Sequence, residues 1–359
     1  MTLRLTPNQR LKLDILERGI DVDDAAAAAL AAPGQPFVVH DYATTGGLTL
    51  VLDDDVWVNA PVEYWFCDRP VATLTLEGDD FVLIGEDVRE HVRVMPLPNY
   101  VALENPPRGL MTHADRIRIS PIDGCAYACL FCDWHDVPYQ TVSVDTLLAG
   151  LRVAADDTAL PARHVLVSGG TPKSGDHAFL AEVYRRIIAE SPLPVDVMLA
   201  PRDGHALLDE IAAAGVHGLS INLEIFDDDI SAQLCPNKHH TGRAGYSDFI
   251  THAVSLLGGH GSGRVRSLLL CGLEPTESTL KGVRFLASLG CDPVLSPFRP
   301  ADGTPLADVR PPSADVLEAL YLAARDIVDE CGVKLGPRCI PCQHNTVTFS
   351  DGSDAYYVS

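Results

Sequence analysis

The strongest constraint on the fold is a regular alternation of strand and helix patterns that begins after Pro107. Short apolar segments, which we expect to be strands, are each followed by a longer segment whose apolar residues have helical spacing. Most of these strands are apolar throughout, which is typical of a parallel sheet covered by helices. The expected strands cover 116–122, 164–168, 195–200, 218–224, 264–271, 292–297 and 333–335, and the expected helices cover 143–155, 177–190, 206–214, 246–257, 278–289 and 313–330.

Six or seven such units favour an α/β fold, a partial or full (β/α) TIM-like barrel. The alternative is an open sheet wound in two halves, but no glycine fingerprint of a dinucleotide site follows any of the strands. Because the active sites of such barrels lie at the carboxyl ends of the strands, residues in the loops that follow strands are the first candidates for chemistry.

Residues 1–107 follow a different pattern and predict a small N-terminal α+β domain, with the barrel and a C-terminal Cys-x2-Cys extension over 108–359. A helix is expected to begin at Thr6 and Pro7 and to end at Gly19. A role as a lid or as a substrate-recognition module is expected, with Trp57, Tyr64 and Trp65 either lining the site or forming the core. We also expect an alanine-rich helix over 24–32 that Pro33 and Gly34 end, strands over 48–52, 56–59, 73–76 and 81–84, and a proline-rich linker over 96–107.

Composition limits the class of protein. The chain has 359 residues, of which 47% are hydrophobic and 21% are charged, as in globular proteins. It has no apolar run of about 18 residues that could span a membrane, and the N-terminal residues lack the apolar segment of a secretory signal, so we expect a cytoplasmic protein. The formal net charge of −22 makes nucleic acid and anionic membranes unfavourable partners.

Three of the ten cysteines form a tight group. Cys125, Cys129 and Cys132 have the spacing Cys-x3-Cys-x2-Cys and directly follow the expected strand 116–122. Three thiolates on one loop can bind three irons of a [4Fe–4S] cluster and leave the fourth iron open for chemistry. A zinc site or a chance group of buried thiols is the alternative, but zinc ribbons use two Cys-x2-Cys knuckles and only one is present locally.

This loop, with Phe131 just before the last cysteine, resembles the signature of the radical S-adenosylmethionine (SAM) superfamily. The resemblance implies that SAM binds the open iron through its amino and carboxylate groups. It also implies that one electron from the cluster cleaves SAM to methionine and a 5′-deoxyadenosyl radical, which abstracts hydrogen from a substrate. An electron donor such as a flavodoxin or a ferredoxin is then required.

Further positions match this family, and the resemblance gives each a role in binding SAM. Ser168, Gly169, Gly170 and Thr171 correspond to a glycine-rich motif that bonds the amino group, although Thr171 stands where that motif usually has an acidic residue. Asn222 and Glu224 correspond to residues that bind the amino group and the ribose hydroxyls. Arg243 is a candidate for the SAM carboxylate, because a guanidinium can donate two parallel hydrogen bonds to it. An ordinary turn, a polar pair in the barrel core and a solvated loop arginine are the respective alternatives.

A second cysteine pair, Cys339 and Cys342, follows the last expected strand and is therefore expected at the same end of the barrel. A lone Cys-x2-Cys pair can serve zinc, redox chemistry or an iron–sulfur cluster. We expect an auxiliary iron–sulfur cluster held by Cys339, Cys342 and Cys271, with Cys235 as the alternate third ligand. His344, the substrate or an exogenous sulfur would complete it. A structural zinc ion or free thiols are the alternatives.

The segments LLLCGLEPTEST and SPFRPADGTPL resemble those of biotin-synthase-like enzymes. By analogy with biotin and lipoyl synthases, we expect hydrogen abstraction from a small polar metabolite, followed by insertion of sulfur from the auxiliary cluster. Epimerisation, dehydrogenation or rearrangement without sulfur is the alternative outcome, and an iron–sulfur or zinc protein that binds a partner is the non-enzyme alternative. Arg266 and Arg299 could hold an anionic group of a nucleotide-like or sugar-like substrate, or they could form salt bridges at the rim.

Overall fold

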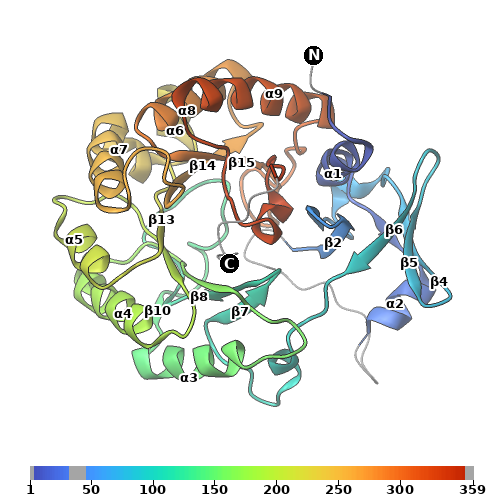
Figure 1. The fold of residues 1–359 in the computed structure, drawn as a ribbon, viewed down its shortest axis with the longest axis horizontal. Helices are drawn as coiled ribbons and strands as arrows, with labels where there is room; N and C mark the ends of the chain where they lie inside the picture. Colours follow the sequence, from blue (N-terminus) through green and yellow to red (C-terminus); the bar gives the residue numbers. More distant parts are fainter. Residues whose placement is uncertain (1–3, 32–45, 352–359) are drawn as a thin grey trace.

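The computed structural model describes residues 4–31 and 46–351, and its largest element is a curled seven-stranded sheet (Figure 1). The strand order is β15-β14-β13-β12-β11-β8-β7, and the sheet is open between β7 and β15. The prediction of an α/β fold with a TIM-like barrel is therefore confirmed in its partial form. The parallel strands are β8 (Arg116–Ile119), β11 (His164–Val167), β12 (Val195–Met198), β13 (Gly218–Ser220), β14 (Val265–Cys271) and β15 (Asp292–Pro297), and β7 (Leu110–His113) is an antiparallel edge strand.

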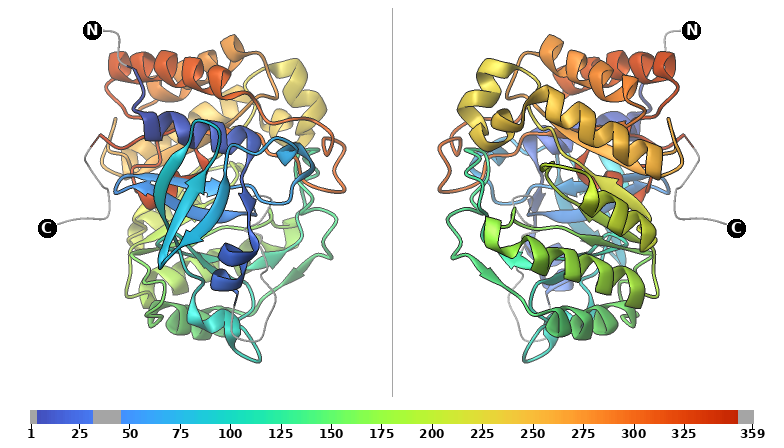
Figure 2. Two further views of the ribbon diagram at one scale, coloured as in Figure 1. Left: turned by 90° about the vertical axis from the view of Figure 1, so that its right-hand side faces the viewer. Right: turned by 90° about the vertical axis from the view of Figure 1, so that its left-hand side faces the viewer.

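Helices cover the outer face of this sheet (Figure 2). Each presents an apolar stripe to the strands; the longest uninterrupted one buries Leu317, Leu320, Ala324 and Val328, which recur every three or four residues. This arrangement directs the loops that follow the strands to one end of the barrel. The helices are α3 (Val144–Ala155), α4 (His177–Glu190), α5 (Ala206–Ala213), α6 (Asp228–Leu234), α7 (Pro236–Leu256), α8 (Thr276–Ser288) and α9 (Ala314–Cys331).

The N-terminal part contains two helices and a second, six-stranded sheet. The predicted first helix, α1 (Pro7–Arg18), is confirmed: the Thr6 hydroxyl accepts from the backbone N–H of Gln9, and the Gln9 side chain accepts from that of Thr6. It ends at Gly19, whose φ of 66° favours glycine. The helix α2 (Asp24–Leu30) matches the alanine-rich prediction, but Ala32, Pro33 and Gly34 lie outside the described residues. The sheet order is β1 (Asp21–Val22), β4 (Thr73–Glu77), β5 (Asp80–Ile84), β6 (Arg89–Val94), β2 (Leu48–Asp53) and β3 (Val56–Ala60).

The N-terminal sheet lies at the open side of the curled sheet (Figures 1 and 2). One continuous set of buried apolar side chains runs through both parts. The buried Arg299 guanidinium, which follows β15, donates to the carbonyl oxygens of Gly46 at 2.6 Å and Asn59 at 2.9 Å. The N-terminal part therefore packs against the barrel over a shared core, and the boundary at residue 107 stays a prediction.

The segment after α9 runs back into the centre of the curled sheet (Figure 1). It contains a short 3-10 helix, η4 (Pro341–Asn345), and it contacts β15 through a bridge between Gly336 and Val294. The strand predicted over 333–335 is absent; its apolar signal comes from Val333 and Leu335, which are buried outside any strand. The amine of Lys12 on α1 donates to the carbonyl oxygens of two residues of this segment, Gln343 at 2.8 Å and Thr348 at 2.9 Å.

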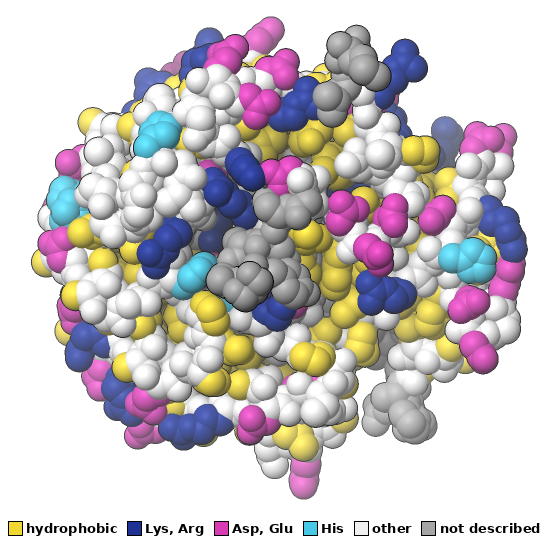
Figure 3. Space-filling model, viewed as in Figure 1, with side chains coloured by type: hydrophobic (Ala, Val, Ile, Leu, Met, Phe, Trp, Pro, Cys, Tyr) yellow, Lys and Arg dark blue, Asp and Glu magenta, His cyan; other side chains and the backbone are white. Residues whose placement is uncertain are grey.

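Within the described ranges, no helix has both the length and the apolar character needed to cross a membrane. On the face shown in Figure 3, acidic and basic side chains are interspersed.

Candidate active site

The cysteine loop lies at the carboxyl end of β8, where the barrel fold predicts chemistry. A short antiparallel pair, β9 (Ile122–Asp123) with β10 (Gln140–Thr141), closes the base of the loop. Cys129 is buried, and Cys125 and Cys132 are partly exposed. The loop is therefore held by local pairing, and two of its three thiols, those of Cys125 and Cys132, remain partly accessible.

A cavity of about 550 Å³ opens at this end of the barrel, and Cys125, Cys129 and Cys132 line it. The residues predicted to bind SAM line the same cavity, with the exception of Arg243. They are Phe131, Ser168, Gly169, Gly170, Thr171, Asn222 and Glu224. The structure thus brings together side chains from the loop after β8, the loop after β11 and the segment after β13.

The surroundings of the three thiols suit an iron–sulfur cluster. The sulfur of Cys125 accepts from the backbone N–H groups of Thr171 at 3.1 Å and Tyr127 at 3.3 Å, and such bonds stabilise a thiolate. Burial raises the pKa of Cys132 to about 11 and raises that of Cys129 further. Bound iron supplies the positive charge that offsets this burial, so binding of a cluster would release protons from these groups.

The loop after β11 approaches the cysteine loop closely. The backbone N–H of Ala126 donates to the Thr171 carbonyl at 2.9 Å, and a Cβ atom at Gly170 would overlap the backbone oxygen of Gly124. Only glycine permits this approach of two backbones.

Gly170→Ala is therefore expected to displace the two loops from each other and to weaken SAM binding at least tenfold. Gly175, in the same connection, has open space around its Cβ position, so Gly175→Ala is the matched control and should bind SAM as the wild type does. Isothermal titration of the anaerobically reconstituted proteins measures both constants. Equal constants for the two variants would show that the close approach does not matter for SAM.

Glu224 forms a partly buried ion pair that the sequence did not reveal. The amine of Lys238 lies 3.0 Å from the Glu224 carboxylate and donates to the Asn222 carbonyl at 2.9 Å. Burial opposes the charge on Lys238, but the Glu224 carboxylate outweighs it and raises the pKa of this amine. Glu224 itself has a φ of 70°, a strained value for a residue with a Cβ, as is common at functional sites. Lys238 was missed because the predicted helix began at Tyr246, whereas α7 begins at Pro236.

Arg118 is a second cation in the cavity that sequence reasoning missed. Its guanidinium donates to the Ser168 hydroxyl at 2.9 Å and lies over the Trp134 ring at 5.8 Å. The alternation Arg-Ile-Arg-Ile in β8 was the available signal: the two isoleucines are fully buried on one face, which directs the arginines to the other.

The structure places three predicted arginines away from the cavity lining. Arg243 is half exposed on α7, where it pairs with Asp228 and lies 5.1 Å from the Phe226 ring. Arg266 pairs with the buried Asp196 at 2.8 Å, near the amino end of β14. Arg299 binds backbone carbonyls of the N-terminal part, as described above. Arg266 therefore forms a salt bridge, as the alternative predicted, although its partner is buried. Arg299 bonds backbone carbonyl oxygens instead of forming the predicted rim salt bridge.

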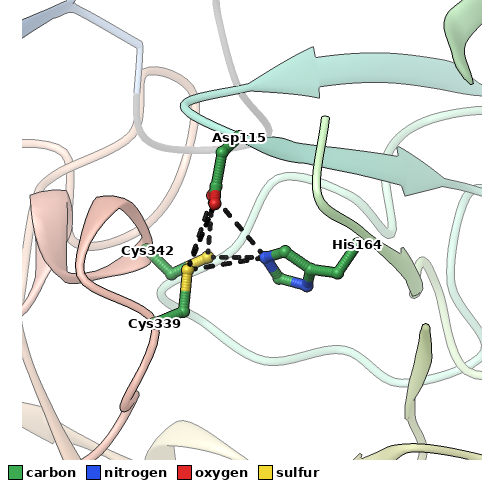
Figure 4. A group of neighbouring side chains, drawn as sticks. All are labelled: Asp115, His164, Cys339 and Cys342. Carbon is green, nitrogen blue, oxygen red and sulfur yellow. Dashed lines mark hydrogen bonds and ion pairs between the residues drawn. The ribbon is translucent and has the colours of Figure 1, made fainter. Parts of the chain in front are cut away.

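The second cysteine pair lies at the opposite end of the barrel from the cavity. Cys339 and Cys342 contact Asp115, which precedes β8, and His164, the first residue of β11 (Figure 4). These positions are at the amino ends of the strands, so the prediction that the pair sits at the catalytic mouth is wrong. The reason is that residues 333–335 do not form a strand. The segment that follows α9 enters the barrel at the amino ends of the strands, so it brings the cysteine pair there.

The predicted ligand set of an auxiliary cluster is accordingly not assembled among the described residues. Cys271 is the last residue of β14, at the carboxyl end of the sheet, and is fully buried. Cys235, the alternate third ligand, packs with Cys129 and Ile225 beside the first cysteine loop. His344 is buried against the His113 ring, with the ring centres 4.5 Å apart.

The N-terminal aromatic residues take structural positions. Trp57 is buried in a small cluster with Val51, and the indole N–H of Trp65 donates to the Ala307 carbonyl at 2.8 Å. Tyr64 packs against the ring of Phe66. Of the residues that the structure describes, those lining the cavity begin at Arg118, so these three aromatics do not belong to its wall.

Comparison with known proteins supports the resemblance of this chain to the radical SAM superfamily. Residues 119–287, just under half of the chain, match a family model described as "Radical SAM superfamily". The bacteriochlorophyllide c C-7(1)-hydroxylase of Chlorobaculum limnaeum is 30% identical over 144 residues, which are 38% of this chain and 36% of that protein. The chain therefore spans about a third of the length of this curated relative.

Two of the solved structures with similarity to this chain have names that mention SAM. A radical SAM methyltransferase from Sphaerobacter thermophilus is 15% identical, with 78% of this chain and 82% of that chain covered and a TM-score of 0.49. Streptococcus suis SuiB bound to S-adenosylmethionine is 14% identical, with 66% of this chain and 53% of that chain covered and a TM-score of 0.49. None of these named proteins is a biotin or lipoyl synthase, and the narrower resemblance to that branch stays a prediction.

Proposed function

We propose that the chain, whose residues 119–287 match the radical SAM family model, is an enzyme that cleaves SAM reductively and abstracts hydrogen from a C–H bond of a small polar substrate. The observation that carries the proposal is the shared cavity: three cysteines, a glycine loop and the Asn222–Glu224 segment line one space at the carboxyl end of the barrel. That is the end at which barrel enzymes hold their reacting groups.

In this proposal Cys125, Cys129 and Cys132 hold a [4Fe–4S] cluster, which supplies the electron for SAM cleavage. The chain's own residues bind and orient SAM. Glu224 offers a carboxylate to the SAM amino group, and its pairing with Lys238 fixes that carboxylate in position. The glycine loop exposes backbone groups to the methionine part, because no side chain intervenes.

Arg118 is the better candidate for the SAM carboxylate, since it lines the cavity and Arg243 is engaged with Asp228 outside it. Arg118→Ala is expected to raise the Kd for SAM at least tenfold, about the value of one charge-assisted bidentate contact. Arg243→Ala is the matched control and should change the Kd less than twofold. The opposite ranking would return the carboxylate to Arg243.

For the fate of the substrate radical we propose an outcome without sulfur insertion: epimerisation, dehydrogenation or rearrangement. Sulfur insertion was expected because a second cluster was expected beside the first. The position of Cys339 and Cys342 at the far end of the barrel removes that support. The relative's name adds hydroxylation to the outcomes to be tested.

The test is anaerobic reconstitution followed by reduction in the presence of SAM. We expect about four irons per chain and release of 5′-deoxyadenosine and methionine. About eight irons would restore the two-cluster hypothesis and sulfur insertion with it. Four irons without SAM cleavage, with either dithionite or a flavodoxin or ferredoxin as the reductant, would favour an iron–sulfur binding protein without radical chemistry.

A further inference from the structure

A buried group of four side chains at the amino end of the barrel has no role in the SAM cavity. Asp115, His164, Cys339 and Cys342 place one ligand atom each within 4.8 Å of one another (Figure 4). All four are nearly inaccessible, with exposed fractions of 6%, 1%, 2% and 4%. They come from the turn before β8, from β11 and from the C-terminal segment.

The distances between these atoms match one shared tetrahedral ion. His164 Nε2 lies 3.2 Å from Cys342 Sγ and 3.5 Å from Cys339 Sγ, and Asp115 Oδ1 lies 3.4 Å, 3.8 Å and 3.6 Å from Cys339 Sγ, Cys342 Sγ and His164 Nε2. With zinc–ligand bonds of 2.0–2.3 Å, the edges of a tetrahedron are about 3.3–3.8 Å. We propose that these four residues bind a structural Zn²⁺ ion.

The same geometry disfavours the other uses of such residues. In a catalytic triad the cysteine and the carboxylate contact different nitrogens of the histidine, whereas here both are nearest to Nε2. The ligands of an iron–sulfur cluster bind different irons and are spread farther apart than ligands of a single ion. Two thiolates, one imidazole and one carboxylate in a tetrahedral set are typical of zinc.

The charge around the site suits this ion. Two thiolates and a carboxylate bring the zinc complex to a net charge of about −1. The Arg163 guanidinium lies against Asp115, at 2.6 Å from Nε and 2.5 Å from Nη2, and offsets that charge. Arg116, Arg264, Arg266 and Arg338 line a small neighbouring cavity with the two cysteines. An outer group that binds a ligand carboxylate in this way orients the ligand and tunes the metal.

A full set of four protein ligands leaves no open position, as in structural rather than catalytic zinc sites. The ion would fasten the C-terminal segment to β8 and β11 and so close the amino end of the barrel. The proposal does not depend on SAM chemistry.

Metal analysis of the full chain tests the site. We expect about one zinc per chain beside about four irons, and complete loss of zinc with iron unchanged in Cys339→Ser and Cys342→Ser. Cys331→Ser, at a partly buried cysteine on α9, is the matched control and should keep the zinc. Zinc retained in both ligand variants, or eight irons falling to four, would overturn the assignment.

X-ray absorption at the zinc edge tests the wild-type protein even where a variant fails to fold. The expected shell has two sulfurs at about 2.3 Å and two nitrogen or oxygen atoms at about 2.0–2.2 Å. A shell without sulfur, or wild-type protein without zinc after growth in zinc-supplemented medium, would overturn the proposal. Loss of SAM cleavage alone would leave the zinc result standing, so the two proposals fail separately.

Discussion

Simultaneous replacement of Cys125, Cys129 and Cys132 by alanine is expected to lower the iron content from about four atoms per chain to none and to abolish SAM cleavage. The three thiols line one cavity and supply the ligands of the proposed cluster. Without them neither an electron nor an open iron is available to SAM. Iron and acid-labile sulfide per chain, with 5′-deoxyadenosine release, are the measurements.

Cys331→Ala is the control for loss of a thiol without a role in the cavity, and it should retain iron and cleavage. Circular dichroism should show the same helix content in both variants, because the barrel helices pack on apolar stripes away from the loop. Iron retained in the triple variant would mean that other residues hold it, and the proposed function would lose its basis.

The second large effect is expected at Asp196, on β12. Its carboxylate is fully buried and contacts Arg266 at 2.8 Å and His217 at 3.0 Å. Asp196→Asn removes the negative charge and leaves two basic side chains at the amino end of the barrel without this partner. The free energy of unfolding should fall by about 3–5 kcal/mol, as for other broken buried ion pairs. Urea denaturation under anaerobic conditions measures it.

The pH dependence gives a second readout for the same pair. Burial opposes the charge of Asp196, but Arg266 and His217 outweigh it and hold the pKa of this carboxyl well below its usual range. A lowered carboxyl pKa stabilises the fold above the unfolded value of about 3.9, and this contribution is lost as the pH falls below it. The difference between wild type and Asp196→Asn should therefore shrink below about pH 4. The exposed Asp209→Asn should show neither effect.

Local sequence patterns predicted those residues of the cavity that directly follow a strand. The cysteine loop, the glycine loop and Asn222 with Glu224 all follow parallel strands, and parallel strands end at the same edge of the sheet. Strand periodicity therefore sufficed to bring these residues to one cavity. Strands with few buried residues were missed. The strand β6 buries only Val92, so its sequence has no clear apolar alternation and it was not predicted.

The zinc-type group illustrates what the sequence alone could not reveal. Asp115 and His164 stand before and at the start of strands, and nothing in their spacing connects them with a cysteine pair more than 170 residues later. Long-range packing of the C-terminal segment brings them together. The wrong placement of Cys339 and Cys342 has the same origin. Val333 and Leu335 are apolar because the C-terminal segment buries them, and this alternation of apolar residues resembles that of a strand.

The contact of Lys12 with Gln343 and Thr348 has a consequence for biosynthesis. The residues of this contact are 331 and 336 positions apart in the chain. During translation α1 leaves the ribosome before the barrel, yet the Lys12 amine receives these carbonyl partners only after nearly the whole barrel has been made. The N-terminal part can pack at the open side of the curled sheet early. Docking of the C-terminal segment must be a late folding event, because contacts between residues so far apart in sequence form slowly.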